Sequence, residues 1–532
     1  MSRWRRSLLF PATVIAFFAL LGGVFGPGVT GVSAAGAEDD IKASLKTFTK
    51  IFNLVENNFA DKVTADKAIY KGAIVGMLRT LDPHSSFFDP RDFQLLREEQ
   101  KGHYYGVGMT VSERNRRTIV IAPFPGSPAY RAGIRPGDVI LEVNDKRTDN
   151  LTTTEVADLL KGPRGTQVQV LISREGMEKP LTFNIVRDEI PRKSVEDAFF
   201  LRPGILYVDI QSFNENTSRE VEDNLRRAGE QNVKGLILDL RENPGGLLNE
   251  GVAVAGRFLQ SGQTVVSHRG RASAEKPYTA RNGSGKRDYP IVVLVNRYSA
   301  SAAEIVAGAL QDHDRAWILG ENTFGKGLVQ TVYPLSETTG LALTTAKYYT
   351  PSGRLIQRDY TKGSFLDYYY RKNLEEKNPL DMKMTDSGRT VYGGGGIEPD
   401  EKIAPTKLNR FQGQLLYKYA FFSFTAKYFG KGEAKLPKGW TPDDAIIAEF
   451  HSYLLKEGLQ FTEAEFAENN EWVKQQLRRE MYLTAFGVEE ARKLAVETDP
   501  VVTKALEGLP KAKALLENAQ KLVVQRLARP PL

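Results

Sequence analysis

Two serines in the chain stand where a serine could act as a nucleophile. Ser299 and Ser301 follow an apolar run that we expect to form a buried strand, and a helical run begins at residue 301. The first amides of a helix have no intrahelical acceptor, so they can stabilise an oxyanion that develops beside such a serine. Serine at a strand–helix junction more commonly serves as an N-cap. The junction alone therefore leaves both roles open.

Lys326 stands between two glycines and follows a predicted strand at residues 316–320. Lysine is a general base only when it is neutral near pH 7, and burial favours the neutral form. Gln330 could orient the amine by a hydrogen bond without adding a charge that would raise the pKa of the lysine. The alternative is an ordinary solvated loop lysine. A phosphate-binding loop is excluded, because Gly327 stands where that motif requires Ser or Thr.

A third segment, Asp239–Gly246, ends another predicted strand in a Pro-Gly-Gly turn. Glycines allow backbone N–H groups to approach a ligand closely, so this turn could supply a second donor to the oxyanion. It could also be a simple turn before a helix, with no chemical role. Its chemical meaning depends on whether the fold brings it to Ser301.

The histidines do not favour the rival arrangement, a Ser-His-Asp triad. His313 lies twelve residues past Ser301, at the end of the same predicted helix and roughly 18 Å away at 1.5 Å per residue. We expect His84 and His103, which lie in other regions, to be structural or exposed. No pair of the five histidines has zinc-site spacing and the chain contains no cysteine. We therefore predict neither a metal site nor a cofactor.

Strands and helices alternate around these three segments. Predicted strands at 205–210, 235–239, 291–295 and 316–320 alternate with predicted helices at 217–230, 248–259 and 301–311. This pattern indicates crossover connections and a largely parallel sheet. We further expect helices at 41–59, 65–81 and 91–101, a surface loop at 268–288, and one aromatic-rich helix at 409–429.

Composition and charge describe a globular, exported protein. The chain has 532 residues, of which 41% are hydrophobic and 26% charged, and this suffices for two to four domains. Three charges of the net +7 are arginines at positions 3, 5 and 6, so no nucleic-acid partner is indicated. An apolar run at 7–25 and small residues at 32–37 follow them, as in a cleaved signal peptide or, alternatively, a membrane anchor. Either places the protein in the periplasm or otherwise outside the cytoplasm.

Taken together, the segments resemble the carboxy-terminal processing, or tail-specific, proteases from about residue 40 to about residue 430. The shared motifs are Leu81–Ser86, Asn-Pro-Gly-Gly, Ser-Ala-Ser-Ala-Ala-Glu, Phe-Gly-Lys-Gly with a glutamine four residues on, Thr350–Arg354 and Gly395–Asp400. The resemblance implies that Ser301 is the nucleophile, Lys326 the base and Gln330 the residue that orients it. It places the oxyanion hole at the amide of Ala302 and at an amide of Gly245-Gly246. The family often has a third serine where this chain has Ala303, a position that is not the nucleophile.

The stretch 102–190 resembles a PDZ domain inserted before the protease core. Tyr105-Gly106-Val107-Gly108-Met109 resembles the carboxylate-binding loop, and Gly126–Ala129 and Gly133–Ile140 resemble the strongest PDZ signature. Backbone amides can capture a terminal carboxylate, and an open sheet edge can accept a peptide as an added strand. The resemblance thus implies binding of substrate tails. The alternative is a regulatory lid, and a gating role is compatible with tail binding.

The sequence therefore predicts an α/β multidomain protein with a crotonase- and ClpP-like protease core, an inserted PDZ β-domain and helical N- and C-terminal regions. The expected regions are a signal peptide or anchor at 1–37, N-terminal helices at 38–101, the PDZ domain at 102–190, the core at 191–408 and C-terminal helices at 409–532. The implied activity is that of a serine endopeptidase acting on exported proteins with unstructured C-terminal tails. An adaptor protein and a homo-oligomer are further expected partners.

Two rival functions stay open at this point. A non-catalytic PDZ scaffold on a dead hydrolase core would have no need of the serine, the lysine and the glutamine described above. A hydrolase of cell-wall peptides or β-lactams would often use Ser-x-x-Lys, but this spacing leads from Ser301 to Glu304 and from Ser299 to Ala302. The C-terminal helices could drive oligomerisation or dock an adaptor, or they could be a packing appendage.

Overall fold

The computed structural model describes residues 34–64, 66–281, 283, 287–361, 365–370, 378–430 and 435–527, which divide into two units at residue 80. In the first unit, helix α2 (Ala34–Asn58) precedes a π-helical segment η1 (Asp66–Ala73) and helix α3 (Ile74–Arg79). Residues 1–33 of the predicted signal peptide or anchor lie outside the described residues. No helix in the described part of the chain is long and apolar enough to cross a bilayer.

A six-stranded sheet forms the centre of the second unit, with the order β10-β11-β12-β15-β16-β21. The strands are β10 (Val195–Arg202), β11 (Ile205–Ile210), β12 (Gly235–Asp239), β15 (Ile291–Val295), β16 (Trp317–Gly320) and β21 (Glu401–Lys402). Strand β10 is antiparallel to β11, and the other neighbouring pairs are parallel. The predicted parallel core is confirmed. The sequence did not reveal the two edge strands, because their polar and apolar residues do not form a continuous hydrophobic run.

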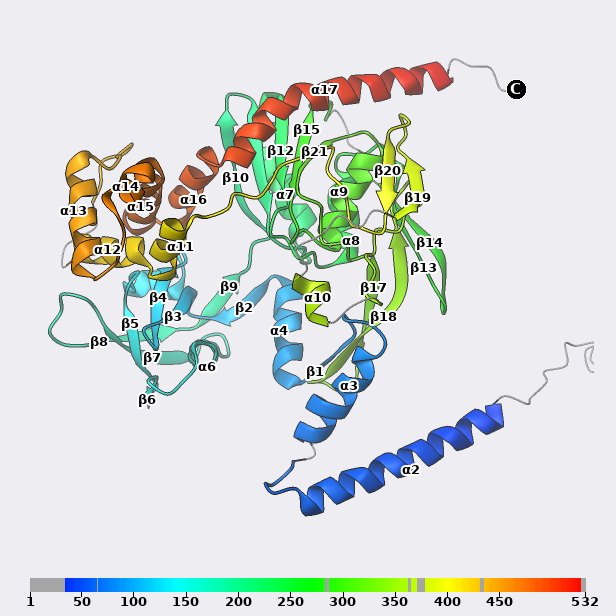
Figure 1. The fold of residues 1–532 in the computed structure, drawn as a ribbon, viewed down its shortest axis with the longest axis horizontal. Helices are drawn as coiled ribbons and strands as arrows, with labels where there is room; N and C mark the ends of the chain where they lie inside the picture. Colours follow the sequence, from blue (N-terminus) through cyan, green and yellow to red (C-terminus); the bar gives the residue numbers. More distant parts are fainter. Residues whose placement is uncertain are drawn as a thin grey trace, which may run out of the picture. The chain divides into compact units, whose positions relative to one another are not determined.

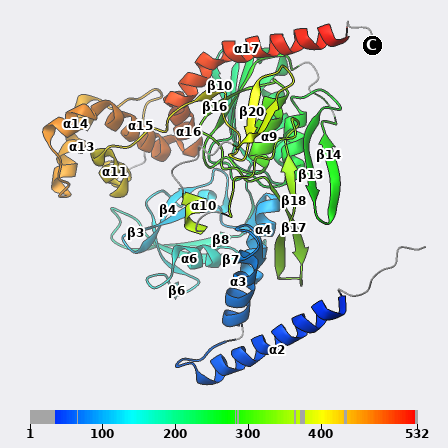
Figure 2. The ribbon, with the colours of Figure 1, turned by 45° about the vertical axis from the view of Figure 1, so that its right-hand side comes forward.

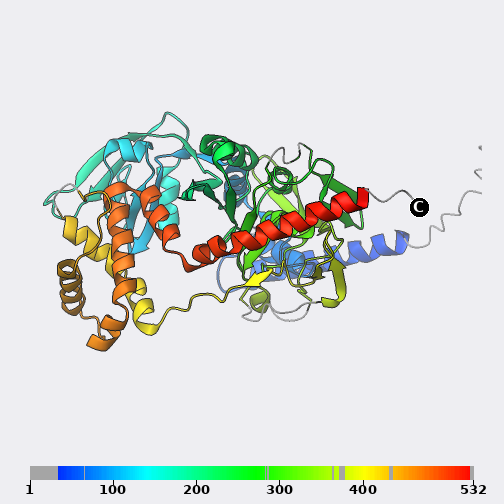
Figure 3. The ribbon, with the colours of Figure 1, turned by 90° about the horizontal axis from the view of Figure 1, so that it is seen from above.

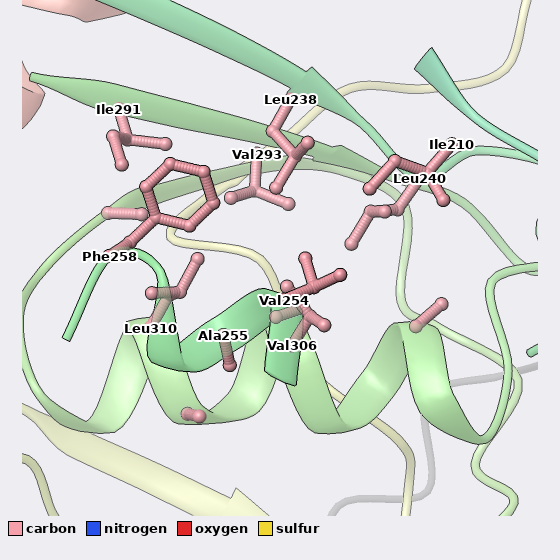
Figure 4. Packing of buried hydrophobic residues seen from close by; sticks show 14 of the residues in the cluster. Ile210, Leu238, Leu240, Val254, Ala255, Phe258, Ile291, Val293, Val306 and Leu310 are labelled. Carbon is pink, nitrogen blue, oxygen red and sulfur yellow. The ribbon is translucent and has the colours of Figure 1, made fainter. Parts of the chain in front are cut away.

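Three helices cover one face of this sheet and position its loops. They are α7 (Thr217–Ala228), α8 (Leu248–Gly256) and α9 (Ala302–Asp312). Figure 4 shows Leu238 and Val293 of the sheet facing Val254 of α8 and Val306 of α9. Each such fully buried side chain contributes about 1.5–3 kcal/mol relative to exposure. This packing fixes the N-terminal end of α9 against the carboxyl ends of the strands.

The opposite face of the sheet is covered by the last helix of the chain, α17 (Pro500–Leu527). Ile237, Val292 and Leu294 of the sheet pack there against Val502 and Ala505. Figures 1 and 3 show α17, in red, lying across the strands. The core is thus a three-layer α/β/α sandwich. Within the C-terminal region 409–532, α17 thus packs on the sheet of the protease core.

A second sheet carries the segments that follow the core strands. Its order is β1-β18-β13-β14, and β17 also pairs with β18; Figure 2 shows this sheet on the side that has come forward. The strands are β1 (Ser86–Phe88), β13 (Thr264–Gly270), β14 (Ser273–Thr279), β17 (Leu328–Pro334) and β18 (Gly340–Tyr349). The surface loop predicted at 268–288 is wrong up to residue 279, because β13 and β14 form a hairpin there. Side chains on both faces of β14 are exposed, so its sequence lacks the hydrophobic alternation of a strand.

The PDZ region has its own sheet and its own core. Strands β3 (Met109–Arg114), β4 (Arg117–Pro123), β5 (Val139–Val143), β7 (Gln167–Ser173) and β8 (Leu181–Val186) pair in that order, and β6 (Lys146–Arg147) pairs with β5. Helices α5 (Pro128–Ala132) and α6 (Thr153–Leu160) complete it. The chain enters the PDZ region through β2 (His103–Gly106) and leaves it through β9 (Asp188–Pro191), and these two strands form an antiparallel pair. Strand β3 ends the sheet, so its outer edge is open within the described residues.

The remaining elements lie before the PDZ region and after the core strands. They are helix α4 (Pro90–Lys101), helix α10 (Phe365–Tyr370), the hairpin β19 (Asn378–Met384) and β20 (Thr390–Gly393), and a helical bundle of α11 (Arg410–Tyr417), α12 (Ala420–Phe429), α13 (Asp444–Lys456), α14 (Glu463–Glu468), α15 (Asn470–Phe486) and α16 (Val488–Glu497). The single helix predicted at 409–429 is wrong. It breaks at Tyr419, whose φ of 52° does not continue a right-handed helix.

Candidate active site

Ser301 lies at the junction of β15 and α9, and its backbone is strained. Its φ is 55°, a value that non-glycine residues adopt uncommonly and that recurs at functional sites. Ser299 has an ordinary structural role: its hydroxyl is buried, donates to the Leu240 carbonyl at 2.7 Å and accepts from the Asn296 amide at 2.9 Å. Of the two serines in the turn, Ser301 is therefore the one that is free to face a pocket.

The Pro-Gly-Gly turn packs directly against the Ser301 turn. A Cβ at Gly245, whose φ is 96°, would lie 2.6 Å from the Ser301 Cβ, so only glycine fits. The Gly245 amide already donates to the Asn243 side chain at 2.8 Å. Gly246 is bridged to Phe213, but its neighbours make the two hydrogen bonds of that bridge. Among the described residues, the amides of Gly246 and Ala302 have no protein acceptor.

Lys326 lies in the loop between β16 and β17, where it is partly buried and lines the same pocket as Ser301. Its Nζ donates to Gln330 Oε1 at 3.0 Å. Burial lowers the pKa of Lys326, and the charges of Glu304 and Asp82 oppose this shift only in part. The amine is therefore biased toward the neutral form that can accept a proton.

One buried carboxylate joins the two turns. Glu304 accepts hydrogen bonds from the amides of Ser301 (2.9 Å), Gly325 (2.7 Å) and Lys326 (2.9 Å), and from the Thr323 hydroxyl (2.5 Å). Its side chain is fully buried, and burial raises its pKa. Glu304 therefore sets the separation between the serine turn and the lysine loop. The sequence analysis did not assign this role, although a carboxylate three residues after a serine at a helix start resembles a capping box.

A pocket of about 310 Å³ connects these groups. Ser301, Lys326, Gln330 and the Gly245-Gly246 turn line it, and most of the other lining side chains are apolar. They include Phe88, Leu96, Leu248, Ile305, Leu328 and Val332. The fold thus brings Ser301, Lys326, Gln330 and the two glycines to one cavity, in surroundings that suit an apolar side chain.

The surroundings of His84 and His313 do not favour a Ser-His-Asp triad. The ring of His84 is within 2.8 Å of the Tyr368 hydroxyl, and its backbone carbonyl accepts from Gln330 Nε2 at 2.5 Å. Burial lowers the pKa of His84 to about 3, so the ring is neutral. His313 caps the far end of α9 and binds Asp386 at 2.7 Å. The described residues contain no group of three or more metal-ligating side chains of His, Cys, Asp or Glu.

The predicted carboxylate-binding loop, Tyr105–Met109, lies between β2 and β3. The Val107 carbonyl accepts from the Ala129 amide at 2.8 Å, and the Gly108 carbonyl accepts from the Ser127 hydroxyl at 2.7 Å. In a trans peptide the N–H points opposite to the carbonyl. The amides of Gly108 and Met109 therefore point away from the interior of the domain, beside the open edge of β3.

Comparisons with known proteins agree with this architecture. Residues 204–363 match the model of peptidase family S41, and residues 119–174 match the PDZ domain. The chain is 40% identical over 325 residues to a carboxy-terminal-processing protease of Bartonella bacilliformis, covering 60% of this chain and 74% of that one. It is 40% identical over 295 residues to a carboxyl-terminal-processing protease of Synechocystis, covering 54% and 68%.

Among solved structures, the photosystem II D1 C-terminal processing protease is 31% identical, with 68% of this chain and 88% of that chain covered and a TM-score of 0.36. The two relatives above carry the assignment, since the chain spans more than two thirds of each. The chain is therefore a serine peptidase that belongs to the carboxy-terminal-processing proteases of peptidase family S41, with a PDZ domain ahead of its α/β core.

Proposed function

We propose that this protein is an endopeptidase that uses a Ser301–Lys326 dyad to cut exported proteins at or near their C-terminal tails. The observation that carries the proposal is the hydrogen bond of Lys326 Nζ to Gln330 in a pocket that also holds Ser301. Gln330 Oε1 accepts one N–H of the neutral amine, which leaves the lone pair of the nitrogen available for the serine proton. A solvated loop lysine would make no such arrangement.

The reaction follows from this geometry. Lys326 takes the proton of Ser301 Oγ while the oxygen attacks the scissile carbonyl carbon, and the same lysine then protonates the leaving amine. Water hydrolyses the acyl-enzyme with Lys326 again as base. The amides of Ala302 and Gly246 donate to the oxyanion, because the Gly245 amide is already bound by Asn243.

Two surfaces of the protein support the class of substrate that we propose. The apolar lining of the pocket favours an apolar side chain next to the scissile bond. The amides of Gly108 and Met109 can bind a terminal carboxylate, and the open edge of β3 can add the tail as a strand. An unstructured C-terminal tail satisfies both requirements. The basic and apolar N-terminal segment supports export, hence a periplasmic or other extracytoplasmic location. The adaptor and the homo-oligomer expected from the sequence stay predictions.

The test compares the purified full chain with its Ser301→Ala variant on fluorescein-labelled β-casein, an unstructured protein. We expect the wild type to cut and the variant to be inactive, and mass spectrometry to locate the first cuts near the casein C-terminus. Equal cleavage by the two proteins would show that Ser301 is not the nucleophile. Absence of cleavage by both, with cell extract added to supply partners, would favour the PDZ scaffold instead.

A further inference from the structure

The segment Asp82–Ser85 forms a tight turn that no step of the proposed reaction uses. Asp82 Oδ1 accepts from the amides of His84 (2.7 Å) and Ser85 (2.8 Å), and Asp82 Oδ2 accepts from the Ser85 hydroxyl at 2.6 Å. The Ser85 hydroxyl in turn accepts from the Thr344 amide of β18 at 3.1 Å. Asp82 and Ser85 are both nearly inaccessible to solvent. Such a turn fixes the direction of the His84 carbonyl.

That carbonyl determines how the Gln330 side chain is oriented. A backbone carbonyl can only accept a hydrogen bond, so it binds the NH₂ group of the glutamine, here at 2.5 Å. The amide oxygen is thereby directed at Lys326 Nζ, 3.0 Å away. If the amide were reversed, its oxygen would face the oxygen of the His84 carbonyl, and its NH₂ group would donate to the lone pair that the neutral amine needs for the serine proton. Asp82 thus holds the segment that carries the His84 carbonyl, this carbonyl orients Gln330, and Gln330 orients Lys326.

Aromatic rings hold the turn from its other side. The His84 ring packs edge-on against Phe324, Tyr368 and Tyr369, with centroid distances of 6.4, 5.5 and 6.0 Å. The Tyr369 hydroxyl donates to the Pro83 carbonyl at 3.0 Å. Because Phe324 belongs to the Lys326 loop, the turn and the loop form one packed unit.

We propose that Asp82 is a positioning residue for the dyad, which holds the His84 carbonyl so that Gln330 presents its oxygen to Lys326. The inference rests on the proposed function. Burial alone would raise the pKa of Asp82, but the hydrogen bonds from Ser85 and from the His84 amide outweigh it and lower the pKa, so the carboxylate is ionised. Asp82 does not line the pocket. A positioning role therefore predicts an effect on kcat with little change in KM.

The experiment is a double-mutant cycle on the full chain, with casein cleavage as the readout. Asp82→Ala should lower kcat by about tenfold or more, with KM nearly unchanged. In a Gln330→Ala background the same substitution should change kcat less than about twofold, because its effect is transmitted through Gln330. Effects that multiply would overturn the proposal, since a merely structural role acts independently of Gln330.

Asp82→Asn supplies the conservative rescue and a pH readout. Its remaining oxygen can still accept the two backbone amides, so kcat should be largely restored. Two negative charges, those of Glu304 and Asp82, oppose the lowered pKa of Lys326. Removing one of them should lower that pKa further and move the acid limb of kcat to lower pH. A variant as slow as Asp82→Ala would contradict positioning by geometry.

Controls separate the failure of this inference from that of the proposed function. Asp443→Ala removes an exposed carboxylate that accepts from the Ile446 amide at 2.9 Å at the start of α13, and it should leave kcat unchanged. If Asp82→Ala does not fold, Ser85→Ala replaces it in the cycle. If the wild type is active and the Asp82→Ala variant is equally active, only the positioning role is rejected. Activity in Ser301→Ala would reject the dyad itself.

Discussion

Among the described residues, no carboxylate lies within ion-pair distance of Lys326. Its amine forms a hydrogen bond with the neutral side chain of Gln330 instead. Burial lowers its pKa for this reason, since little opposing charge is present to hold the proton. As the pH falls through that lowered pKa, Lys326, the proposed base, becomes protonated and kcat should fall. The acid limb of the pH–kcat profile therefore reports the state of Lys326.

Gln330→Glu should move that limb in a predictable direction. A carboxylate beside Nζ favours the charged amine, so the pKa of Lys326 rises and a neutral base exists only at higher pH. We expect the acid limb to shift upward by about one pH unit or more in casein cleavage measured from pH 5 to pH 10. Gln330→Met removes the hydrogen bond without adding charge and should show no such upward shift. A limb that stays in place in the Glu variant would argue against Lys326 as the base.

His84 predicts a dependence of stability on pH. Its pKa is about 3 in the folded state and about 6.5 in an unfolded chain. The unfolded chain therefore takes up the proton first as the pH falls, so the stability contributed by neutral His84 is present above pH 6.5 and lost below it. The loss should reach about 2 kcal/mol at pH 5. Calorimetry should find a smaller decrease of the unfolding temperature between pH 7 and pH 5 in His84→Gln, and an equal decrease would disprove this account.

The resemblance to the tail-specific proteases, together with the residue types, placed Ser301, Lys326 and Gln330 in one candidate site. They could not assign Asp82 or Glu304, whose roles depend on backbone amides and carbonyls. The His84 carbonyl meets Gln330 across 246 positions of sequence, and every residue type carries such a carbonyl. Contacts of this kind leave no pattern in the sequence, so they become visible only in the fold.

At the scale of elements, hydrophobic runs predicted the central strands β11, β12, β15 and β16 because these are buried on both faces. The hairpin β13–β14 was missed because its outer strand is exposed on both faces. The same limit applies to α17, whose amphipathic pattern indicates a helix but does not say which surface it covers. Tertiary packing decides the surface that a helix or strand covers, and the residue pattern along one segment does not encode that surface.

Leu509 tests the contribution of α17 to the protease core. It is nearly fully buried, and its Cδ atoms lie close to Gly235 at the start of β12. Leu509→Ala should cost about 2–5 kcal/mol of unfolding free energy, as other cavity-forming core substitutions do. Glu507→Ala, at a solvent-exposed side chain of the same helix, should change it by less than about 0.5 kcal/mol. Urea unfolding followed by tryptophan fluorescence, to which Trp317 beside α17 contributes, compares the two. Equal stability would mean that α17 is an appendage.

At the scale of the whole molecule, the chain combines a peptide-binding module with a peptidase core, and the resemblance of residues 102–190 to PDZ domains anticipated that combination. Tail binding by the Gly108 and Met109 amides predicts a requirement for a free carboxylate. A ten-residue apolar peptide with a free C-terminus should bind the Ser301→Ala protein at least about tenfold more tightly than its C-terminal amide, because the amide lacks the charge that strengthens these hydrogen bonds. Fluorescence anisotropy measures both affinities.

The contrast between the two peptides also decides between tail capture and the lid alternative. If acid and amide bind equally, or neither binds, the loop is not a carboxylate site, and the PDZ domain acts as a lid. A peptide with the same composition and a terminal proline serves as a control for sequence-independent binding. It should bind weakly in both forms, because proline has no amide N–H to pair with the edge of β3.

The position of α17 in the chain has a consequence for synthesis. The ribosome releases the serine and the lysine of the site well before the helix that covers the far face of their sheet. Domains fold as units from the N-terminus onward, so the sheet that aligns Ser301 and Lys326 lacks one of its two helical layers until residues 500–527 have emerged. The three-layer core is therefore completed only when α17 docks on the sheet.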